Sequence, residues 1–228
     1  MKSVIFDFDG VIVDSFLDQY QWFKRISRIL NKEFNYSLDE FREVYREPVY
    51  PNMYDYLKLE WDKNKDVIWD EYNLWKRSSS VKLFPNVKIL LQCLKRKNLE
   101  LAIASTNTKE AIDKVLRENE LEEYFSLVVS KDDVPEVNGE PLLKPHPACL
   151  LIALNGLGHK PEQSMYVGDQ ESDIVAANKV EQYYGRKLEV IAVTYGYSPR
   201  RKLLQADYLA STPEEIYNVI HEKLDKDV

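Results

Sequence analysis

The most informative stretch of the sequence lies near the N-terminus at residues 4–15, which are Val4-Ile5-Phe6-Asp7-Phe8-Asp9-Gly10-Val11-Ile12-Val13-Asp14-Ser15. An apolar strand stops at two aspartates that are one residue apart, and a glycine follows. Side chains alternate along a strand, so Asp7 and Asp9 point to one side and Phe8 points to the interior. Neighbouring carboxylates repel each other unless a cation lies between them or one is protonated, and Gly10 permits a tight turn close to a ligand. The stretch predicts a metal-assisted nucleophile and acid/base pair. The alternative is a strand that runs into an ordinary Asp-Gly turn.

Composition limits the classes of protein to which the chain can belong. It has 228 residues, a formal net charge of −7 and an isoelectric point of about 5.2. This length allows a large core, and the acidic balance argues against a broad nucleic-acid surface. Cys93 and Cys149 lack metal-binding spacing, as expected in a reducing compartment. The chain starts with a strand rather than a signal sequence, and no apolar run has membrane-spanning length. We expect a cytoplasmic protein with no nucleic-acid or membrane partner.

Residues 16–81 differ from the rest of the chain because they show helical patterns and lack strand-like runs. The predicted helices span 16–31, 38–46, 53–60 and 64–78, and Pro48 and Pro51 interrupt the segment in its middle. All four tryptophans lie here, which is typical of the core of a small helical unit.

From Val81 onward, apolar strands alternate with amphipathic helices. The predicted strands are Leu99–Ser105, Ser126–Ser130, Met165–Gly168, Val190–Thr194 and Tyr208–Ala210, and the predicted helices lie near 87–97, 108–118, 147–156, 173–184 and 213–225. Such alternation predicts an α/β fold, a Rossmann-like parallel sheet with helices on both faces. The first strand belongs to this sheet, so the helical segment is an insertion. We expect a core domain of residues 1–14 and 82–228 and an α-helical cap domain of residues 15–81.

Polar residues gather where the predicted strands end, and ligands of open parallel sheets bind beyond those ends. The strand at 99–105 leads into Ser105, Thr106 and Asn107. A hydroxyl and the free N–H groups at the start of a helix can hold a phosphate oxygen. The alternative is that Ser105 or Thr106 caps the helix that begins near Thr108.

Two further polar groups follow along the chain. Lys144-Pro145-His146-Pro147 presents a lysine on a turn stiffened by proline, although a single lysine is usually a solvated surface residue. Asp169 ends the strand at 165–168, and Asp173 lies one helical turn further on. Acids at a helix start also suit the helix dipole. An acid pair, a hydroxyl, a lysine and a second acid pair, in that order, together favour one shared active site.

These motifs resemble those of the haloacid dehalogenase superfamily, in its branch of phosphatases with a helical cap inserted after the first motif. The matching runs are Asp7-Phe8-Asp9-Gly10-Val11, Ser105, Lys144-Pro145-His146-Pro147 and Gly168-Asp169 to Asp173, with Phe84-Pro85 and Ala176-Ala177 in support. The resemblance covers essentially the whole chain, and within the branch it is to the phosphoglycolate phosphatases. The chain departs from the pattern at Asn86 and Asn178, where relatives usually have glycine.

The resemblance implies a role for each matching residue. Asp7 is expected to be the nucleophile that forms an aspartyl-phosphate, and Asp9 the acid for the leaving alcohol and then the base for water. The expected phosphate-binding residues are Gly10, Ser105, Thr106 and Lys144. The expected metal-binding residues are Asp7, Asp9 through its backbone carbonyl, Asp169, and Asp173 through water. A site with only oxygen ligands independently suits Mg²⁺.

Single residues distinguish this activity from others on the same scaffold. Dehalogenases that resemble this pattern lack the second acid, because a halide leaves without a proton. The presence of Asp9 therefore argues against that activity. Sugar-phosphate mutases of the β-phosphoglucomutase type keep both acids but generally carry a histidine where Gln19 stands. A non-catalytic phosphate-binding or regulatory protein is expected to have lost Asp7 or Asp9. We therefore expect a Mg²⁺-dependent phosphatase of a small phosphorylated metabolite, with the mutase and the non-catalytic protein as alternatives.

The break inside the helical insertion is the predicted specificity segment. Arg46, Tyr50 and Asn52 offer hydrogen-bonding groups there, and we expect them to contact the non-phosphate part of the substrate. The alternative is a plain turn between helices with Tyr50 packed inward. The sequence leaves open the natural substrate and the oligomeric state, monomer or homodimer.

Overall fold

A six-stranded parallel sheet forms the centre of the α/β part, as the sequence pattern predicts. The computed structural model describes residues 1–45, 49, 51–78 and 80–226. The sheet has the order β10-β9-β8-β1-β4-β5. Its strands are β1 (Ser3–Phe6), β4 (Glu100–Ala104), β5 (Leu127–Val129), β8 (Ser164–Gly168), β9 (Glu189–Val193) and β10 (Tyr208–Ala210). Because β1 lies between β4 and β8 and runs parallel to both, the residues that follow these three strands meet at one edge of the sheet.

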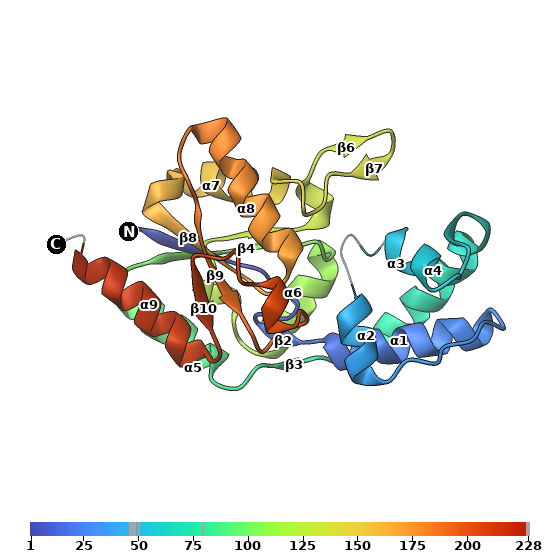
Figure 1. Ribbon diagram of the computed structural model, residues 1–228. Helices are drawn as coiled ribbons and strands as arrows, with labels where there is room; N and C mark the ends of the chain where they lie inside the picture. Colours follow the sequence, from blue (N-terminus) through green and yellow to red (C-terminus); the bar gives the residue numbers. More distant parts are fainter. Residues whose placement is uncertain (46–48, 50, 79, 227–228) are drawn as a thin grey trace.

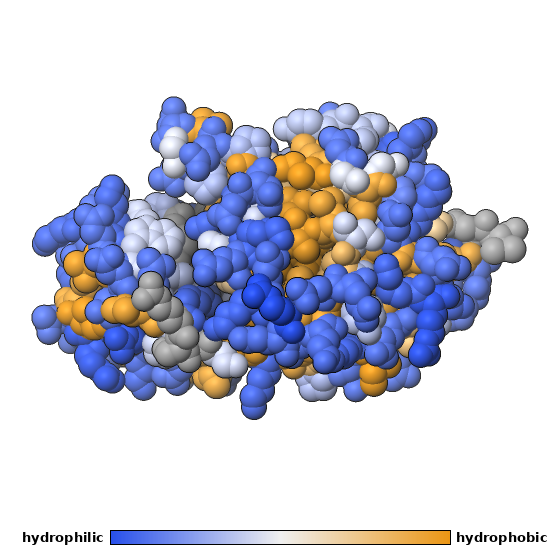
Figure 2. Space-filling view, turned by 180° about the vertical axis from the view of Figure 1, so that it is seen from behind, coloured by the Kyte–Doolittle hydropathy of each residue, from blue (hydrophilic) through white to orange (hydrophobic). Residues whose placement is uncertain are grey.

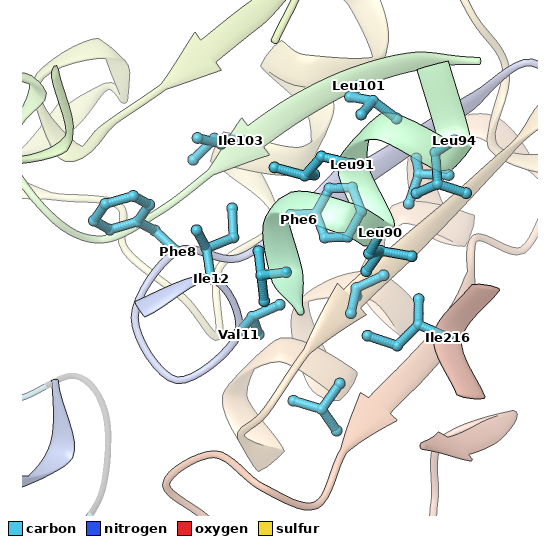
Figure 3. Close-up of a cluster of buried hydrophobic side chains, with 14 of the residues drawn as sticks. Phe6, Phe8, Val11, Ile12, Leu90, Leu91, Leu94, Leu101, Ile103 and Ile216 are labelled. Atoms are coloured by element: carbon cyan, nitrogen blue, oxygen red, sulfur yellow. The ribbon is translucent and has the colours of Figure 1, made fainter. Parts of the chain in front are cut away.

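Helices cover both faces of the sheet (Figure 1). One hydrophobic core involves α5 (Val87–Arg96), α6 (Lys109–Glu118) and α9 (Pro213–Lys226), and the other involves α7 (Ala148–Leu157) and α8 (Glu171–Tyr184). Alternation along β1 supplies both, since Phe6 packs in the first core and Ile5 in the second. Phe8 also points into the first core and is 1% exposed, as predicted (Figure 3).

Four helices form a separate group, the helical unit, at one end of the sheet (Figure 1). They are α1 (Phe16–Ile29), α2 (Leu38–Val44), α3 (Asn52–Tyr56) and α4 (Trp61–Ser78). Their shared core is aromatic and buries Trp22, Phe23, Phe41 and Tyr54. Trp22 Nε1 donates to Tyr54 Oη at 2.8 Å, so the polar atoms of these two rings are paired. The concentration of large aromatic residues in this segment thus builds a core, as predicted.

Two short antiparallel strands join the helical unit to the sheet. β2 (Val13–Asp14) pairs with β3 (Lys82–Leu83) where the chain leaves the α/β part and where it returns. A second short pair, β6 (Glu136–Val137) and β7 (Glu140–Pro141), forms a projecting hairpin (Figure 1). The sequence pattern predicts neither pair, because two residues are too few to show an alternation.

The ends of the predicted elements shift by a few residues, as at α8, which begins at Glu171. Asn86, just before α5, adopts a left-handed φ of 66°. Asparagine tolerates this conformation better than most residues do. The same conformation suits the glycine that the family resemblance leads us to expect at this position. The face seen in Figure 2 is mainly hydrophilic, with hydrophobic side chains gathered over the α/β part. Within the described ranges, no helix has both the length and the hydrophobicity needed to cross a membrane.

Candidate active site

The residues that follow β1 and β8 lie side by side at the carboxyl edge of the sheet. Phe6, the last residue of β1, is in register with Val167 of β8, and the Asp7 N–H donates to the Val167 carbonyl at 2.8 Å. Asp7 is 2% exposed and Asp169 is fully buried. The parallel pairing of the two strands is therefore what brings the two acids together.

Lys144 lies inside this edge rather than on the surface. Its side chain is fully buried, and its Nζ is 2.8 Å from Asp7 Oδ1 and 2.7 Å from Asp173 Oδ1. It also donates to the Tyr166 hydroxyl at 3.2 Å. The alternative of a solvated lysine is therefore wrong. A buried ammonium without partners would be very unfavourable, and here two carboxylates compensate its charge.

Asp173 accepts hydrogen bonds at both carboxylate oxygens. Its Oδ1 accepts from Lys144 Nζ at 2.7 Å and from Tyr166 Oη at 2.6 Å. Its Oδ2 accepts from the backbone N–H groups of Asp169 and Gln170, each at 2.9 Å. Four donors restrict this carboxylate strongly. The arrangement favours Asp173 as the residue that positions Lys144 and the turn after β8, rather than as a direct metal ligand.

Three buried carboxylates at this edge can hold a cation. One oxygen each of Asp7, Asp169 and Asp173 lies within 4.8 Å of the others. Together they bring three negative charges, against the one positive charge of Lys144, and a divalent cation would compensate the excess. Since four donors already occupy Asp173, Asp7 and Asp169 are the carboxylates best placed to bind it. These oxygen donors are of the kind that Mg²⁺ prefers.

The predicted phosphate-binding segment follows β4 and contacts the first motif through the hydrogen bond from Asn107 Nδ2 to Asp9 Oδ2. The Ser105 hydroxyl is buried and accepts from the Asn107 N–H at 3.1 Å, and Thr106 is half-buried beside it. Thr108 caps α6, because its side chain accepts from the Ala111 N–H. The alternative in which Ser105 or Thr106 is the cap is therefore wrong.

Asp9 is held by a side chain at each carboxylate oxygen. Ser15 Oγ donates to Oδ1 at 2.5 Å, and Asn107 Nδ2 donates to Oδ2 at 2.9 Å. Asp9 is half-buried, whereas Asp7 is buried. The two acids of the first motif thus differ in environment, which suits a division of roles between them.

Two buried groups near Lys144 keep their protons at neutral pH. Burial and then the nearby Asp173 charge raise the pKa of the Tyr166 phenol well above its ordinary value, so the phenol acts as a donor to Asp173. Burial raises the pKa of the Cys149 thiol to about 12. Because the thiolate is the nucleophilic form of cysteine, the Cys149 thiol is a poor nucleophile at neutral pH.

The predicted specificity segment is described only in part. Arg46 and Tyr50 lie outside the described residues, and Asn52 is exposed as the first residue of α3. Among the described residues of the helical unit, Arg42 of α2 contacts the α/β part, since its Nη1 donates to the Tyr197 carbonyl at 3.2 Å.

Four residues of the site were not among those predicted from the sequence. They are Ser15, Asn107, Tyr166 and Tyr197. Ser15 is the last residue of the stretch 4–15, and Asn107 follows Ser105 and Thr106 after a predicted strand. Their positions beside predicted motifs could have identified both as site residues. Tyr166 reads as a core residue of a buried strand, and Tyr197 lies in a loop without any pattern.

The comparisons with known proteins identify the family. A family model described as haloacid dehalogenase-like hydrolase matches residues 4–184. A phosphorylated carbohydrates phosphatase of Thermotoga maritima is 31% identical, over 98% of this chain and 100% of that protein. A phosphoglycolate phosphatase of Synechococcus elongatus is 27% identical, over 96% of this chain and 97% of that protein. The crystal structure of a predicted phosphatase from Clostridium acetobutylicum matches with a TM-score of 0.80 at 21% identity, over 97% of this chain and 98% of that chain. The chain therefore belongs to the haloacid dehalogenase-like hydrolases.

Proposed function

We propose that this hydrolase is a Mg²⁺-dependent phosphatase that acts on a small phosphorylated metabolite. The observation that carries the proposal is the buried Asp7 carboxylate, which lies 2.8 Å from Lys144 Nζ and within a cluster of acids. Further support comes from relatives named as phosphatases of phosphorylated carbohydrates and of phosphoglycolate. The substrate class that follows is a phosphate monoester of a small metabolite.

Two carboxylates divide the proposed reaction between them. A carboxylate oxygen of Asp7 attacks phosphorus and forms an aspartyl-phosphate, while the bond to the leaving oxygen breaks and Asp9 gives that oxygen a proton. Asp9 then takes a proton from water, whose oxygen attacks phosphorus. The bond between phosphorus and Asp7 breaks, and inorganic phosphate leaves. Both acids return to their starting protonation states.

The neighbouring residues are proposed to hold the phosphoryl group and the ion. Ser105, Thr106, Lys144 and the backbone at Gly10 would bind the phosphoryl oxygens. Asp7, the Asp9 carbonyl and Asp169 would hold Mg²⁺, and Asp173 would act through its hydrogen bonds. When bound, the ion supplies positive charge that offsets the repulsion between the phosphate and the carboxylates.

The helical unit is proposed to be a cap domain of residues 15–81 on a core of residues 1–14 and 82–228. A pocket of about 190 Å³ is lined by Tyr45 of the helical unit, by Gln170 of the turn after β8, by Ser172 of α8 and by Lys202, among others. Gln170, which lines this pocket, directly follows Asp169 in the sequence. This position of the pocket suits the non-phosphate part of a small substrate. Arg46, Tyr50 and Asn52 stay the proposed specificity residues, of which only Asn52 is among the described residues.

Gly10→Ala should lower kcat/KM by ~10-fold or more. A Cβ at Gly10 would lie 2.1 Å from Asp169 Oδ2, so the carboxylate must move away from the proposed metal site. The matched control is Gly139→Ala in the β6–β7 hairpin. Its φ of +80° equals the +81° of Gly10 within a degree, but nothing lies within 4 Å of the added Cβ. Both variants therefore place alanine at the same left-handed φ, and equal losses of activity in steady-state assays would contradict the steric explanation.

Asp169→Ala should raise the Mg²⁺ concentration for half-maximal activity by ~10-fold or more. Asp173→Asn should raise it less, because Asp173 already accepts from four donors. Glu181→Gln, an exposed acid further along α8, is the matched control. Calorimetric titration of the metal-free proteins with Mg²⁺ measures binding independently of turnover. Identical titrations for the wild type and Asp169→Ala would remove Asp169 from the metal site.

Product analysis separates the proposed phosphatase from its alternatives. The protein is assayed with p-nitrophenyl phosphate and with a panel of phosphorylated metabolites, with Mg²⁺ and with a chelator. Release of inorganic phosphate that the chelator abolishes is the expected result. Transfer of phosphate between positions of a sugar without release would indicate a mutase, and binding without turnover would indicate a non-catalytic protein.

A further inference from the structure

Tyr197 belongs to the α/β part by sequence and to the helical unit by packing. It lies in the loop after β9 and is 2% exposed. Its ring contacts Phe16 and Tyr45 of the helical unit, with centroid distances of 5.1 and 5.2 Å. It is therefore a member of the aromatic core that the helical unit builds around Trp22 and Phe41.

A directed chain of hydrogen bonds runs from Tyr197 to Asp9. Ser15 Oγ donates to Asp9 Oδ1 at 2.5 Å and lies 2.6 Å from Tyr197 Oη. A serine hydroxyl has one hydrogen, and here Asp9 receives it. The second bond must then use the Tyr197 hydrogen, so the chain runs from phenol to serine to carboxylate. Hydrogen bonds in such a chain strengthen one another.

The backbone around Tyr197 is fixed from both sides. Its N–H donates to Asp169 Oδ2 at 2.6 Å. Its carbonyl accepts from Arg42 of α2 at 3.2 Å, and the same guanidinium donates to the Gly196 carbonyl and lies 4.1 Å above the Phe16 ring. One residue thus contacts a proposed metal ligand, the hydrogen-bond chain to Asp9 and the helical unit.

We propose that Tyr197 is a positioning residue that orients the general acid Asp9 through Ser15 and couples that orientation to the helical unit. This inference rests on the proposed function, because it assigns Asp9 the transfer of a proton to the leaving oxygen. The chain keeps Asp9 Oδ1 an acceptor from Ser15. Oδ2 is then the oxygen that carries the proton toward the leaving group, which requires that it release or share its bond to Asn107.

Loss of the Tyr197 hydroxyl should lower kcat/KM only for substrates whose leaving group needs a proton. In Tyr197→Phe, the buried Ser15 hydroxyl loses its donor and can turn away from Asp9, so the acid is oriented less well. Phenyl phosphate and p-nitrophenyl phosphate have nearly the same shape. Phenolate is a strong base, with a conjugate-acid pKa of about 10 as in tyrosine, whereas p-nitrophenolate leaves readily without protonation.

The expected result is a selective loss. Tyr197→Phe should lower kcat/KM for phenyl phosphate by ~10-fold or more, a part of the 10²–10⁴ that a general acid supplies, and for p-nitrophenyl phosphate by less than ~3-fold. Ser15→Ala should show the same selectivity. The double variant should be no worse than Ser15→Ala alone, because Tyr197 acts through Ser15. Tyr195→Phe is the matched control, since its hydroxyl donates to the Val11 carbonyl in the same region and not to Ser15.

Three outcomes would overturn the inference. They are equal losses on both substrates, additive losses in the double variant, and the same selectivity in Tyr195→Phe. Thermal unfolding of each variant identifies a loss that comes from lower stability, which would affect both substrates alike. A wild-type protein that releases phosphate from neither compound would instead overturn the proposed function, so the two failures are distinguishable.

Discussion

Asp7→Asn should abolish turnover, with a loss in kcat/KM on the order of 10³-fold or more, while the protein stays folded. The amide has nearly the same shape, but it is a poor nucleophile and lacks the charge that faces Lys144 Nζ at 2.8 Å. Lys144 keeps its second partner, Asp173, at 2.7 Å, so the fold should tolerate the change. Acid-quenched wild-type protein should carry covalent phosphate after incubation with substrate, and the variant should carry none.

The control for this result is Asp113→Asn, which makes the same chemical change on α6, where Asp113 pairs with Lys109 in a partly exposed position. It should retain wild-type kinetics. If Asp7→Asn kept as much as ~10% of the wild-type rate, well above what a residual nucleophile-free reaction supplies, the assignment of Asp7 as the nucleophile would be wrong.

Lys144→Met should destabilise the protein by about 3–5 kcal/mol, because removing one partner of a buried ion pair leaves the remaining charge uncompensated. Lys144 is fully buried, and its removal leaves Asp7 and Asp173 facing each other without the ammonium between them. For a chain of this length the midpoint of thermal unfolding should fall by roughly 10 °C. Activity should also be lost, since the same charge is proposed to face the phosphoryl group.

A second substitution separates these two effects. In Lys144→Met/Asp173→Asn, the amide oxygen can accept from the N–H groups that now reach Asp173 Oδ2, and the amide nitrogen can face Tyr166. Stability should therefore recover in part, while activity should not. Lys109→Met, which removes a partly exposed ion pair with Asp113, should change stability by less than ~1 kcal/mol. A similar effect of the two lysine substitutions would contradict the buried-pair explanation.

The sequence predicts the sheet and the place of the main motifs because both follow from local patterns. Short apolar runs that alternate with helical patterns predict parallel strands, and parallel strands bring their carboxyl ends to one edge. Asp7 after β1 and Asp169 after β8 meet there for this reason, and the family match over residues 4–184 agrees. The helical segment at 16–78 could also be predicted from the sequence, since it shows helical patterns and lacks strand-like runs.

The hydrogen bonds and ion pairs between the side chains at that edge become visible only in the folded protein. The residues around Lys144 in the sequence are compatible with an exposed lysine. The folded chain instead buries Lys144 between Asp7 and Asp173, where α7 and α8 pack on the sheet. Asp173 could bind a metal or position a neighbour, and its four donors favour the second role.

The link from Tyr197 through Ser15 to Asp9 joins residues 182 and 6 positions apart along the chain. A repeating pattern of hydrophobic residues indicates which face of a strand or helix is buried, so the α/β core, the helical insertion and the strand-end motifs could be predicted from the sequence. A hydrogen bond between loops depends instead on the positions of atoms to within a fraction of an ångström. No periodicity encodes those positions, so the partners of Asp9, Lys144 and Asp173 became known only from the folded chain.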